Sequence, residues 1–432
     1  MNDCPSYGSI SKDPTASPRY AEDGTPVAAF GQPETLTGNG AAFIGVLCVF
    51  AGTGTLGIPG ALKDAGWSGL ILLLTAAMMA IYCGRLLIKC LYYEEGKRLQ
   101  GFPEIAQASF GTFGKYFVGI FYNSILLGGP IIYLILAGTN MHQLLLPYGV
   151  HLGVKTWILL LGISLLPPLI LSKTMKEATI LSLFGAFATA LVVVVVFVVS
   201  FVDYGQGHRS TGGHQFIRSS QLPTALGTFA FSYGGNVVLP HIQQTMKHPK
   251  AWSWVYPLAA AVVTGMYLMI GISGYYVYGA ETVSPIYDNL PDGWSKTLSI
   301  LVMTIHVLLT TPIFLTSFSL EVEEIFKIDR QHRSPTMEFV LRAIVRTLAM
   351  GLCILIATTV PYFGDFMNLL GSLSEGLLTF VFPVAFYWRL YGWSHPPWYE
   401  RIWGAAIILV GVVGCILGTI ESLEALHRDF TA

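Results

Sequence analysis

The stretch AGTGTLGIPGALKDAGW, residues 51–67, interrupts an apolar segment with residues that break helices, namely Gly52, Gly54, Gly57, Pro59 and Gly60. A helix inside a bilayer has to satisfy all its backbone groups internally. A break is therefore tolerated only where the loosened backbone faces protein or a water-filled cavity. The stretch predicts a ligand site within the first membrane span.

The same glycines also fit G-x-G-x-x-G, the pattern of a dinucleotide-binding loop, through Gly52, Gly54 and Gly57. That loop needs a short strand before it, a βαβ unit around it and an acidic residue about 20 positions later. Long apolar runs, residues 40–51 and 70–81, flank the glycines instead. The context favours a broken membrane helix.

Composition indicates a polytopic membrane protein. The chain has 432 residues, of which 53% are hydrophobic and 11% charged, whereas soluble domains carry about 25% charged residues. A net charge of -1 gives no reason to expect a nucleic-acid partner. The six cysteines lack metal-ligand spacing, and no Ser-His-Asp or paired-carboxylate pattern is present. We expect no metal, no cofactor and no enzymatic activity.

The apolar runs divide the chain into three parts. Residues 1–38 are polar and rich in Pro, Gly and Ser, which predicts a disordered cytosolic tail. Residues 39–423 are expected to form the transmembrane domain, and residues 424–432 a short non-cytoplasmic tail. Eleven runs are long enough to span a bilayer: 40–62, 68–91, 116–146, 156–172, 178–203, 222–245, 252–279, 296–326, 339–361, 364–390 and 400–423.

The distribution of basic residues orients these runs. With a cytosolic N-terminus, the cytoplasmic segments and span ends hold 18 of the 24 Lys and Arg residues, and the other side holds the remaining 6. Cytoplasmic loops of membrane proteins carry the excess of basic residues. The sequence therefore predicts a cytosolic N-terminus.

A second break lies in the sixth run. Residues 222–231 lead into Ser232-Tyr233-Gly234-Gly235-Asn236, and an apolar stretch resumes at residues 237–245. Breaks in the first and sixth spans, five spans apart, are typical of a five-plus-five inverted transporter repeat, with the eleventh span as an addition. Glycines that merely mediate helix packing are the alternative.

Broken helices suit a zwitterionic ligand. The second half of a broken span starts with free N–H groups at a positive dipole end, which favour a carboxylate. Freed carbonyls at the end of the first half hold a cation or an ammonium group. We expect Gly52, Thr53 and Gly54 to bind the substrate carboxylate. We expect backbone carbonyls of Phe231, Ser232, Tyr233 and Gly234 to bind the amine. Tyr233 and Asn236 are expected to shape the substrate pocket, and Tyr133 to cover the substrate.

From residue 40 to its end the chain resembles the amino acid/auxin permease superfamily. The likeness rests on GTGTLGIPGALKDAGW (52–67), FSYGGNVVLPHIQQTMKHP (231–249) and VPYFGDFMNLLGSLSEGLLTFVFPVAFYWRL (360–390). Within it, the chain is most similar to vesicular inhibitory and vacuolar amino-acid transporters, on CLYYEE (90–95), SLLPPLIL (164–171), YDNLPDG (287–293) and SLEALHRDF (422–430).

The resemblance implies an all-α, LeuT-like fold of eleven transmembrane helices. It also implies proton-coupled transport of neutral amino acids of the GABA or glycine kind by alternating access, in a vacuolar, lysosomal or vesicle membrane. Sodium and chloride stay open as coupling ions, and the protein is expected to be a monomer. The alternatives are an amino-acid sensor and a sodium-coupled permease of the plasma membrane.

Polar residues within the apolar runs are candidates for ion coupling, because ionisable groups inside membranes are rare. His306 lies in the middle of the eighth run and Glu375 in the tenth. A neutral, hydrogen-bonded histidine and a structural carboxylate are the alternatives. Thr310 and Thr311 follow His306 and face the first span by analogy with the fold, although their hydroxyls can instead bond back to their own helix.

Overall fold

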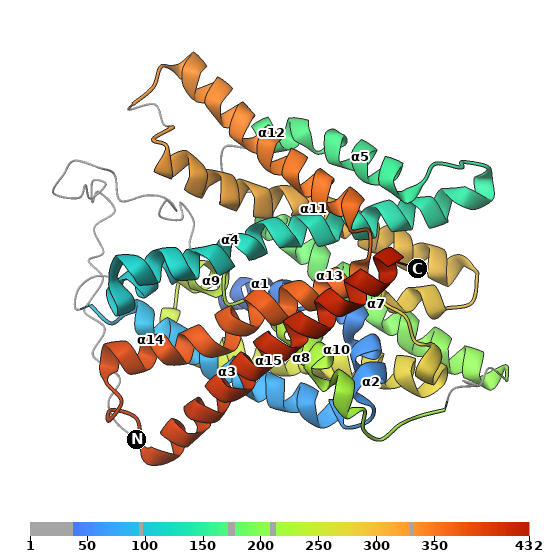
Figure 1. Cartoon of the computed structure of the whole chain (residues 1–432), viewed down its shortest axis with the longest axis horizontal. Coiled ribbons are helices and arrows are strands. Elements are labelled where there is room, and N and C mark those ends of the chain that lie inside the picture. The colour runs from blue at the N-terminus through green and yellow to red at the C-terminus, as the bar shows by residue number, and fades with distance from the viewer. Residues whose placement is uncertain (1–37, 95–97, 172–177, 208–212, 329–331, 432) are drawn as a thin grey trace.

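The computed structural model describes residues 38–94, 98–171, 178–207, 213–328 and 332–431 (Figure 1). Nearly the whole of the predicted N-terminal tail lies outside these residues. All regular elements in the described ranges are helical. The prediction of an all-α membrane protein is confirmed.

The first span is broken where the glycines predict it. Helix α1 (Asn39–Phe50) ends before Gly52, the 3-10 turn η1 (Thr53–Gly57) follows, and α2 (Ile58–Ala65) completes the span. The two halves are bent by 43°. Pro59 stands in the first turn of α2, where its missing N–H costs no hydrogen bond.

The sixth span is broken as well. Helix α8 (Leu222–Ser232) ends at the predicted motif. Residues 233–238 belong to no helix, and α9 (Leu239–Gln244) follows them. Pro223 and Pro240 stand at the starts of these two helices. The paired interruptions of the predicted inverted repeat are therefore present in the structure.

The other spans are formed by longer or paired helices. They are α3 (Gly69–Leu91), α4 (Phe102–Leu145), α5 (Val154–Ser164) with α6 (Leu166–Leu171), α7 (Ala178–Gly205), α10 (Trp252–Tyr278), α11 (Trp294–Ile325), α12 (Pro335–Thr359) and α15 (Trp398–Thr431). The tenth span consists of α13 (Phe363–Leu370), the π-helical turns η7 (Gly371–Glu375) and η8 (Leu377–Val381), and α14 (Phe382–Tyr391).

Within the described residues, nine helices are long and apolar enough to span a membrane, and the bent first pair makes a tenth. The count of eleven spans is not reached, because α8 and α9 are too short singly and are separated by six residues. Helix α15 continues to Thr431 and so includes most of the predicted C-terminal tail.

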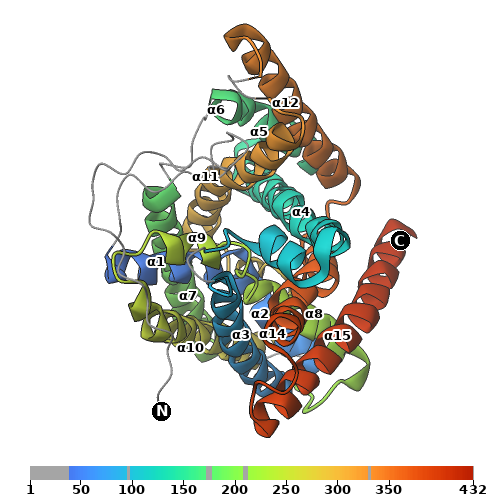
Figure 2. The ribbon, with the colours of Figure 1, turned by 90° about the vertical axis from the view of Figure 1, so that its left-hand side faces the viewer.

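The helices form two groups (Figures 1 and 2). The break-bearing group contains the first, second, sixth and seventh spans, in which α1 and α2 pack on α10, and α2 and α3 on α8. The α4 group contains the third, fourth, eighth and ninth spans, in which α4 packs on α5, α11 and α12. Spans five positions apart fall in the same group, as an inverted repeat requires.

The fifth and tenth spans connect the two groups. Helix α7 packs on α1 and α10 as well as on α11, and the tenth span packs on α8 as well as on α4. The contact between α8 and the tenth span depends on glycine, because a Cβ at Gly371 would overlap the Gly227 backbone carbonyl. Helix α15 lies outside, against α8 and the tenth span.

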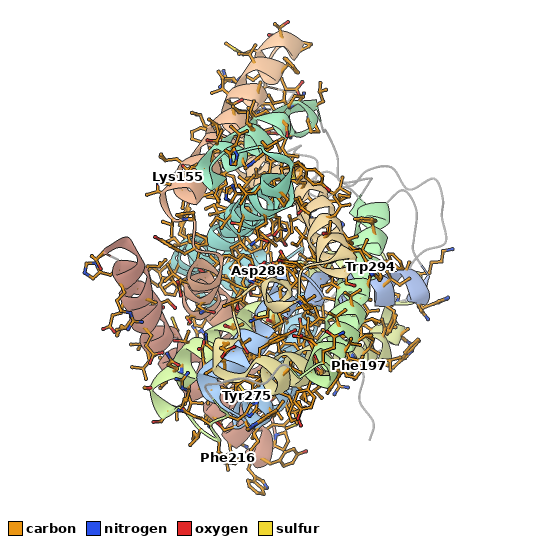
Figure 3. The ribbon with its side chains drawn as sticks, turned by 90° about the vertical axis from the view of Figure 1, so that its right-hand side faces the viewer. Lys155, Phe197, Phe216, Tyr275, Asp288 and Trp294 are labelled. Carbon is orange, nitrogen blue, oxygen red and sulfur yellow. The ribbon has the colours of Figure 1, made fainter. Side chains whose placement is uncertain are left out.

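Figure 3 faces the end of the molecule where Trp294, Asp288 and Lys155 lie. There the segment before α8 forms backbone hydrogen bonds with the turn that follows α2. Trp67 N donates to the Gln215 carbonyl at 3.1 Å, and Ser68 N donates to the Phe216 carbonyl at 2.8 Å. Gly66, at φ +71°, makes the turn possible, since a side chain is strained in that region.

Candidate functional site

The first break is packed directly against the end of α8. A Cβ at Gly54 would lie 2.7 Å from Ser232 Oγ and 2.8 Å from Ser232 Cα, so only glycine allows this approach. Thr53 beside it is 1% exposed. Gly52 differs, because a Cβ there would have no neighbour nearer than the Val49 carbonyl oxygen, at 4.0 Å. Free space therefore borders Gly52 and not Gly54.

The last residues of α8 and Tyr233 after it bond to different parts of the protein. The Ser232 hydroxyl donates back to the Thr228 carbonyl at 2.7 Å, and the Phe231 carbonyl accepts from Gly234 N at 3.0 Å. The Tyr233 side chain is fully buried. Its hydroxyl lies 2.8 Å from the Thr264 hydroxyl of α10, and its ring packs edge-on against Phe50 of α1.

A tyrosine that the sequence analysis did not single out joins the two breaks. Tyr267 of α10 is fully buried. Its hydroxyl lies 2.6 Å from the Phe50 carbonyl oxygen and 2.6 Å from the Ser232 carbonyl oxygen. Phe50 is the last residue of α1 and Ser232 the last of α8. Tyr267 is one of several tyrosines in an apolar run, so no local pattern sets it apart.

Glu375 lies at the second break. A Cβ at Gly234 would overlap the Glu375 carboxyl group, which is 3% exposed. Thr379 donates to Glu375 Oε2 at 3.2 Å, and Asn236 Nδ2 donates to the Thr379 carbonyl at 3.1 Å. Asn236 is therefore held by the tenth span. Glu375 itself belongs to a π-helical turn, and such turns occur frequently at functional sites.

His306 lies apart from that cluster, where α11 meets α7 and α1. A Cβ at Gly185 of α7 would overlap the His306 ring and would lie 3.1 Å from Cys48 Sγ of α1. The histidine is 3% exposed, and within the described residues its Nδ1 has no hydrogen-bond partner. Glycine at position 185 thus creates the room for a buried imidazole.

The two threonines after His306 bond back to their own helix. Thr310 Oγ1 donates to the His306 carbonyl at 2.8 Å, and Thr311 Oγ1 donates to the Val307 carbonyl at 2.7 Å. Their protons are therefore engaged, while the oxygen lone pairs can still accept or coordinate. A role in ion coupling stays a prediction for both residues.

Tyr133 of α4 lies between the groups. Its side chain is 8% exposed and packs edge-on against Phe314 of α11, with ring centroids 5.7 Å apart. It is also close enough to Cys48 and Glu375 for electrostatic interaction. The predicted site residues thus gather around the two breaks, whereas His306 and the threonines lie on the side of α7 and α11.

Two cavities lie elsewhere in the molecule. One of about 560 Å³ opens between α5 and α12 and is lined by Lys155, Leu159 and Ile354, among others. A smaller one lies between α8, the tenth span and α15, beside Gly227 and Ser372. Neither is lined by the residues of the breaks, which instead pack against one another.

Comparison with known proteins agrees with this architecture. Residues 37–424 match the model of the family described as transmembrane amino acid transporter protein. Among curated proteins, the chain is 28% identical over 398 residues to amino acid transporter AVT1C of Arabidopsis thaliana, covering 91% of this chain and 70% of that one. It is also 28% identical to amino acid transporter AVT1J of the same plant, covering 88% and 89%.

Solved structures show the same fold at low sequence identity. A Na+-coupled sialic acid symporter aligns with a TM-score of 0.57 and 12% identity, covering 91% of this chain and 90% of that one. MhsT in complex with L-phenylalanine aligns with a TM-score of 0.53 and 12% identity, covering 87% and 98%. The fold is LeuT-like, and the chain belongs to the transmembrane amino acid transporter family.

Proposed function

We propose that this amino-acid transporter is a proton-coupled secondary transporter of neutral amino acids. It works as a monomer in the membrane of an acidic organelle, by alternating access about the two broken spans. The observation that carries the proposal is the meeting of two helix ends. The last carbonyls of α1 and α8 converge on one point, and the C-terminal ends of helices attract positive charge.

Both charged groups of an amino acid have a counterpart in this arrangement. The converging Phe50 and Ser232 carbonyls suit an ammonium group. The backbone after Gly52 starts the second half of the first span, where N–H groups and the positive dipole end suit a carboxylate. Since free space borders Gly52, we assign the carboxylate to Gly52 and Thr53, with Gly54 serving the contact with α8. Tyr233 and Asn236 bound the side-chain pocket.

Proton coupling is proposed from two buried ionisable groups that lie where the two helix groups meet. Glu375 abuts the second break, and His306 abuts α7 and α1. Both are 3% exposed, and intramembrane ionisable groups are commonly parts of ion pathways. Histidine ordinarily changes charge between about pH 5 and 8, the range between a neutral cytosol and an acidic lumen. The choice of organelle rests on the family resemblance.

Uptake into proteoliposomes tests the proposal. The purified protein is given a panel of radiolabelled amino acids under an imposed pH gradient, with sodium replaced by choline. Accumulation of neutral amino acids driven by the pH gradient is the expected result. Accumulation that follows only a sodium gradient would favour the plasma-membrane permease, and binding without uptake would favour the sensor.

A further inference from the structure

The Tyr267 hydroxyl occupies the point where the two broken spans meet. It lies 2.6 Å from the carbonyl oxygens of Phe50 and Ser232, which end α1 and α8. The three residues come from three different spans, and the Tyr267 side chain is fully buried. Tyr267 therefore bridges the two breaks.

The Tyr267 hydroxyl cannot donate to both carbonyls at once. A tyrosine hydroxyl carries a single proton, so it can donate to only one of the two carbonyls at a time. Gly52 N supplies a second donor to the Phe50 carbonyl, at 2.8 Å. The partial negative charges of both helix ends nevertheless face a neutral group. An ammonium group has three donors and a full positive charge, and it matches this position better than the hydroxyl does.

We propose that Tyr267 is a positioning residue whose hydroxyl fills the amine subsite of the empty transporter and gives way to the ammonium group of the substrate. The assignment rests on the proposed function, because it takes the converging carbonyls as the amine subsite. Thr55 Oγ1 is the alternative partner for the displaced hydroxyl. It is buried near Tyr267, and within the described part of the chain it has no hydrogen-bond partner.

The Tyr267 hydroxyl is expected to act differently in the empty and in the substrate-loaded transporter. Without substrate, the Tyr267 hydroxyl stabilises the closed state through which the empty protein returns. With substrate, the ammonium group stabilises the same contact between α1 and α8. Loss of the hydroxyl therefore affects the empty protein and leaves the loaded protein nearly unchanged.

The experiment compares net uptake with exchange in Tyr267→Phe, using radiolabelled glycine, alanine and GABA in proteoliposomes. Net uptake requires the empty protein to return, whereas exchange with internal substrate does not. A buried hydrogen bond contributes enough to change a rate about two- to tenfold. We expect the ratio of net uptake to exchange to fall by about that factor, and the affinity for the amino acid to rise by a similar one.

Tyr256→Phe is the matched control. Tyr256 is also a fully buried tyrosine of α10, and its hydroxyl donates to the Ala80 carbonyl of α3 at 2.8 Å rather than to a carbonyl that ends a broken helix. Its ring lies 6.0 Å from the Phe50 ring between centroids, and phenylalanine keeps that ring contact. This variant is expected to keep the wild-type ratio of net uptake to exchange and the wild-type affinity for the amino acid. If Tyr267→Phe is unstable when empty, added amino acid is expected to restore its thermal stability, and a lack of restoration contradicts the proposal.

The outcomes separate the two proposals. A transporting wild-type protein together with a Tyr267→Phe variant of unchanged ratio and affinity would overturn the Tyr267 assignment alone. A wild-type protein that neither binds nor transports any of these amino acids would overturn the proposed function and the Tyr267 assignment together.

Discussion

Gly54 and Gly52 stand two residues apart in the first break and have different surroundings. Gly54 touches Ser232, whereas Gly52 borders free space. We expect Gly54→Ala to lower the free energy of unfolding by about 1–3 kcal/mol, as overpacking of a tight contact does, and to reduce transport strongly. Thermal unfolding and uptake of the same purified variant are the measurements.

Gly52→Ala provides the comparison for Gly54. Its backbone lies at φ -103° and ψ -153°, which other residues can adopt, so the fold is expected to tolerate the methyl group. If Gly52 borders the carboxylate subsite, the larger Gly52→Val should raise the KM for uptake while thermal stability changes little. Equal loss of stability in Gly52→Ala and Gly54→Ala would contradict the packing difference.

His306 is the first residue to test for proton coupling. His306→Gln keeps hydrogen-bonding groups and removes titration. We therefore expect uptake to lose most of its response to an imposed pH gradient, while exchange at equal pH survives. Full gradient-driven uptake by His306→Gln would make the histidine structural.

Glu375→Gln is the companion variant to His306→Gln. Its amide retains the acceptor for Thr379 but has no proton to exchange. If the carboxyl at the second break couples transport, Glu375→Gln should show the same loss of gradient response that is expected of His306→Gln. A variant with an intact gradient response would leave Glu375 as a structural group that fills the space beside Gly234.

At the scale of elements, Arg98 of the loop after α3 forms hydrogen bonds with two residues of α9. Arg98 Nη2 donates to the Pro240 carbonyl at 2.6 Å and to Gln243 Oε1 at 3.0 Å. Gln243 Nε2 in turn donates to the Tyr92 hydroxyl at 2.8 Å. Because α9 has only six residues, it depends on such contacts more than a full-length helix does.

We expect Arg98→Ala to lower the free energy of local opening of α9 by about 1.5–3 kcal/mol, the contribution typical of hydrogen bonds from a charged group. Hydrogen–deuterium exchange should then be faster in residues 239–244 and unchanged in α8. Arg85→Ala is the control, because Arg85 makes one long, exposed contact of 3.5 Å with the Ser253 carbonyl. Equal effects of both variants would contradict the anchoring role of Arg98.

At the scale of the molecule, α11 offers two positions at which the predicted orientation can be tested. Its 32 residues are about 48 Å long at 1.5 Å per residue, more than the roughly 30 Å hydrocarbon core. Asp292 before it and Lys327 after it therefore lie on opposite faces of the membrane. The excess of basic residues predicts that Lys327 lies on the cytosolic face.

Cysteine labelling tests this orientation. In a Cys4→Ser background, an impermeant maleimide applied to sealed organelles with the cytosolic face outward should label Lys327→Cys and spare Asp292→Cys. Both native positions are exposed, and the native cysteines of the described residues are at least partly buried. The reverse pattern of labelling would overturn the predicted orientation.

The sequence by itself determined where the membrane helices run and where two of them break. Apolar runs of span length, interrupted at Gly52 and at residues 233–236, are local features, and a bilayer leaves the backbone few other choices. The five-span separation of the breaks indicated the repeat. The count of eleven spans stays a prediction, because length and composition identify nine or ten spans in the described residues. The sixth span is missing from that count since its halves, α8 and α9, are each too short to be recognised.

Only the tertiary structure decided which side chains meet at the breaks. Tyr267 is 217 residues from Phe50 and 35 from Ser232 along the chain, and its apolar surroundings in sequence match those of other tyrosines in α10. Likewise, the overlap of Glu375 with the space beside Gly234 depends on how the tenth span packs on α8. Such contacts follow from the crossing of whole helices, which is a property of close packing rather than of any local pattern.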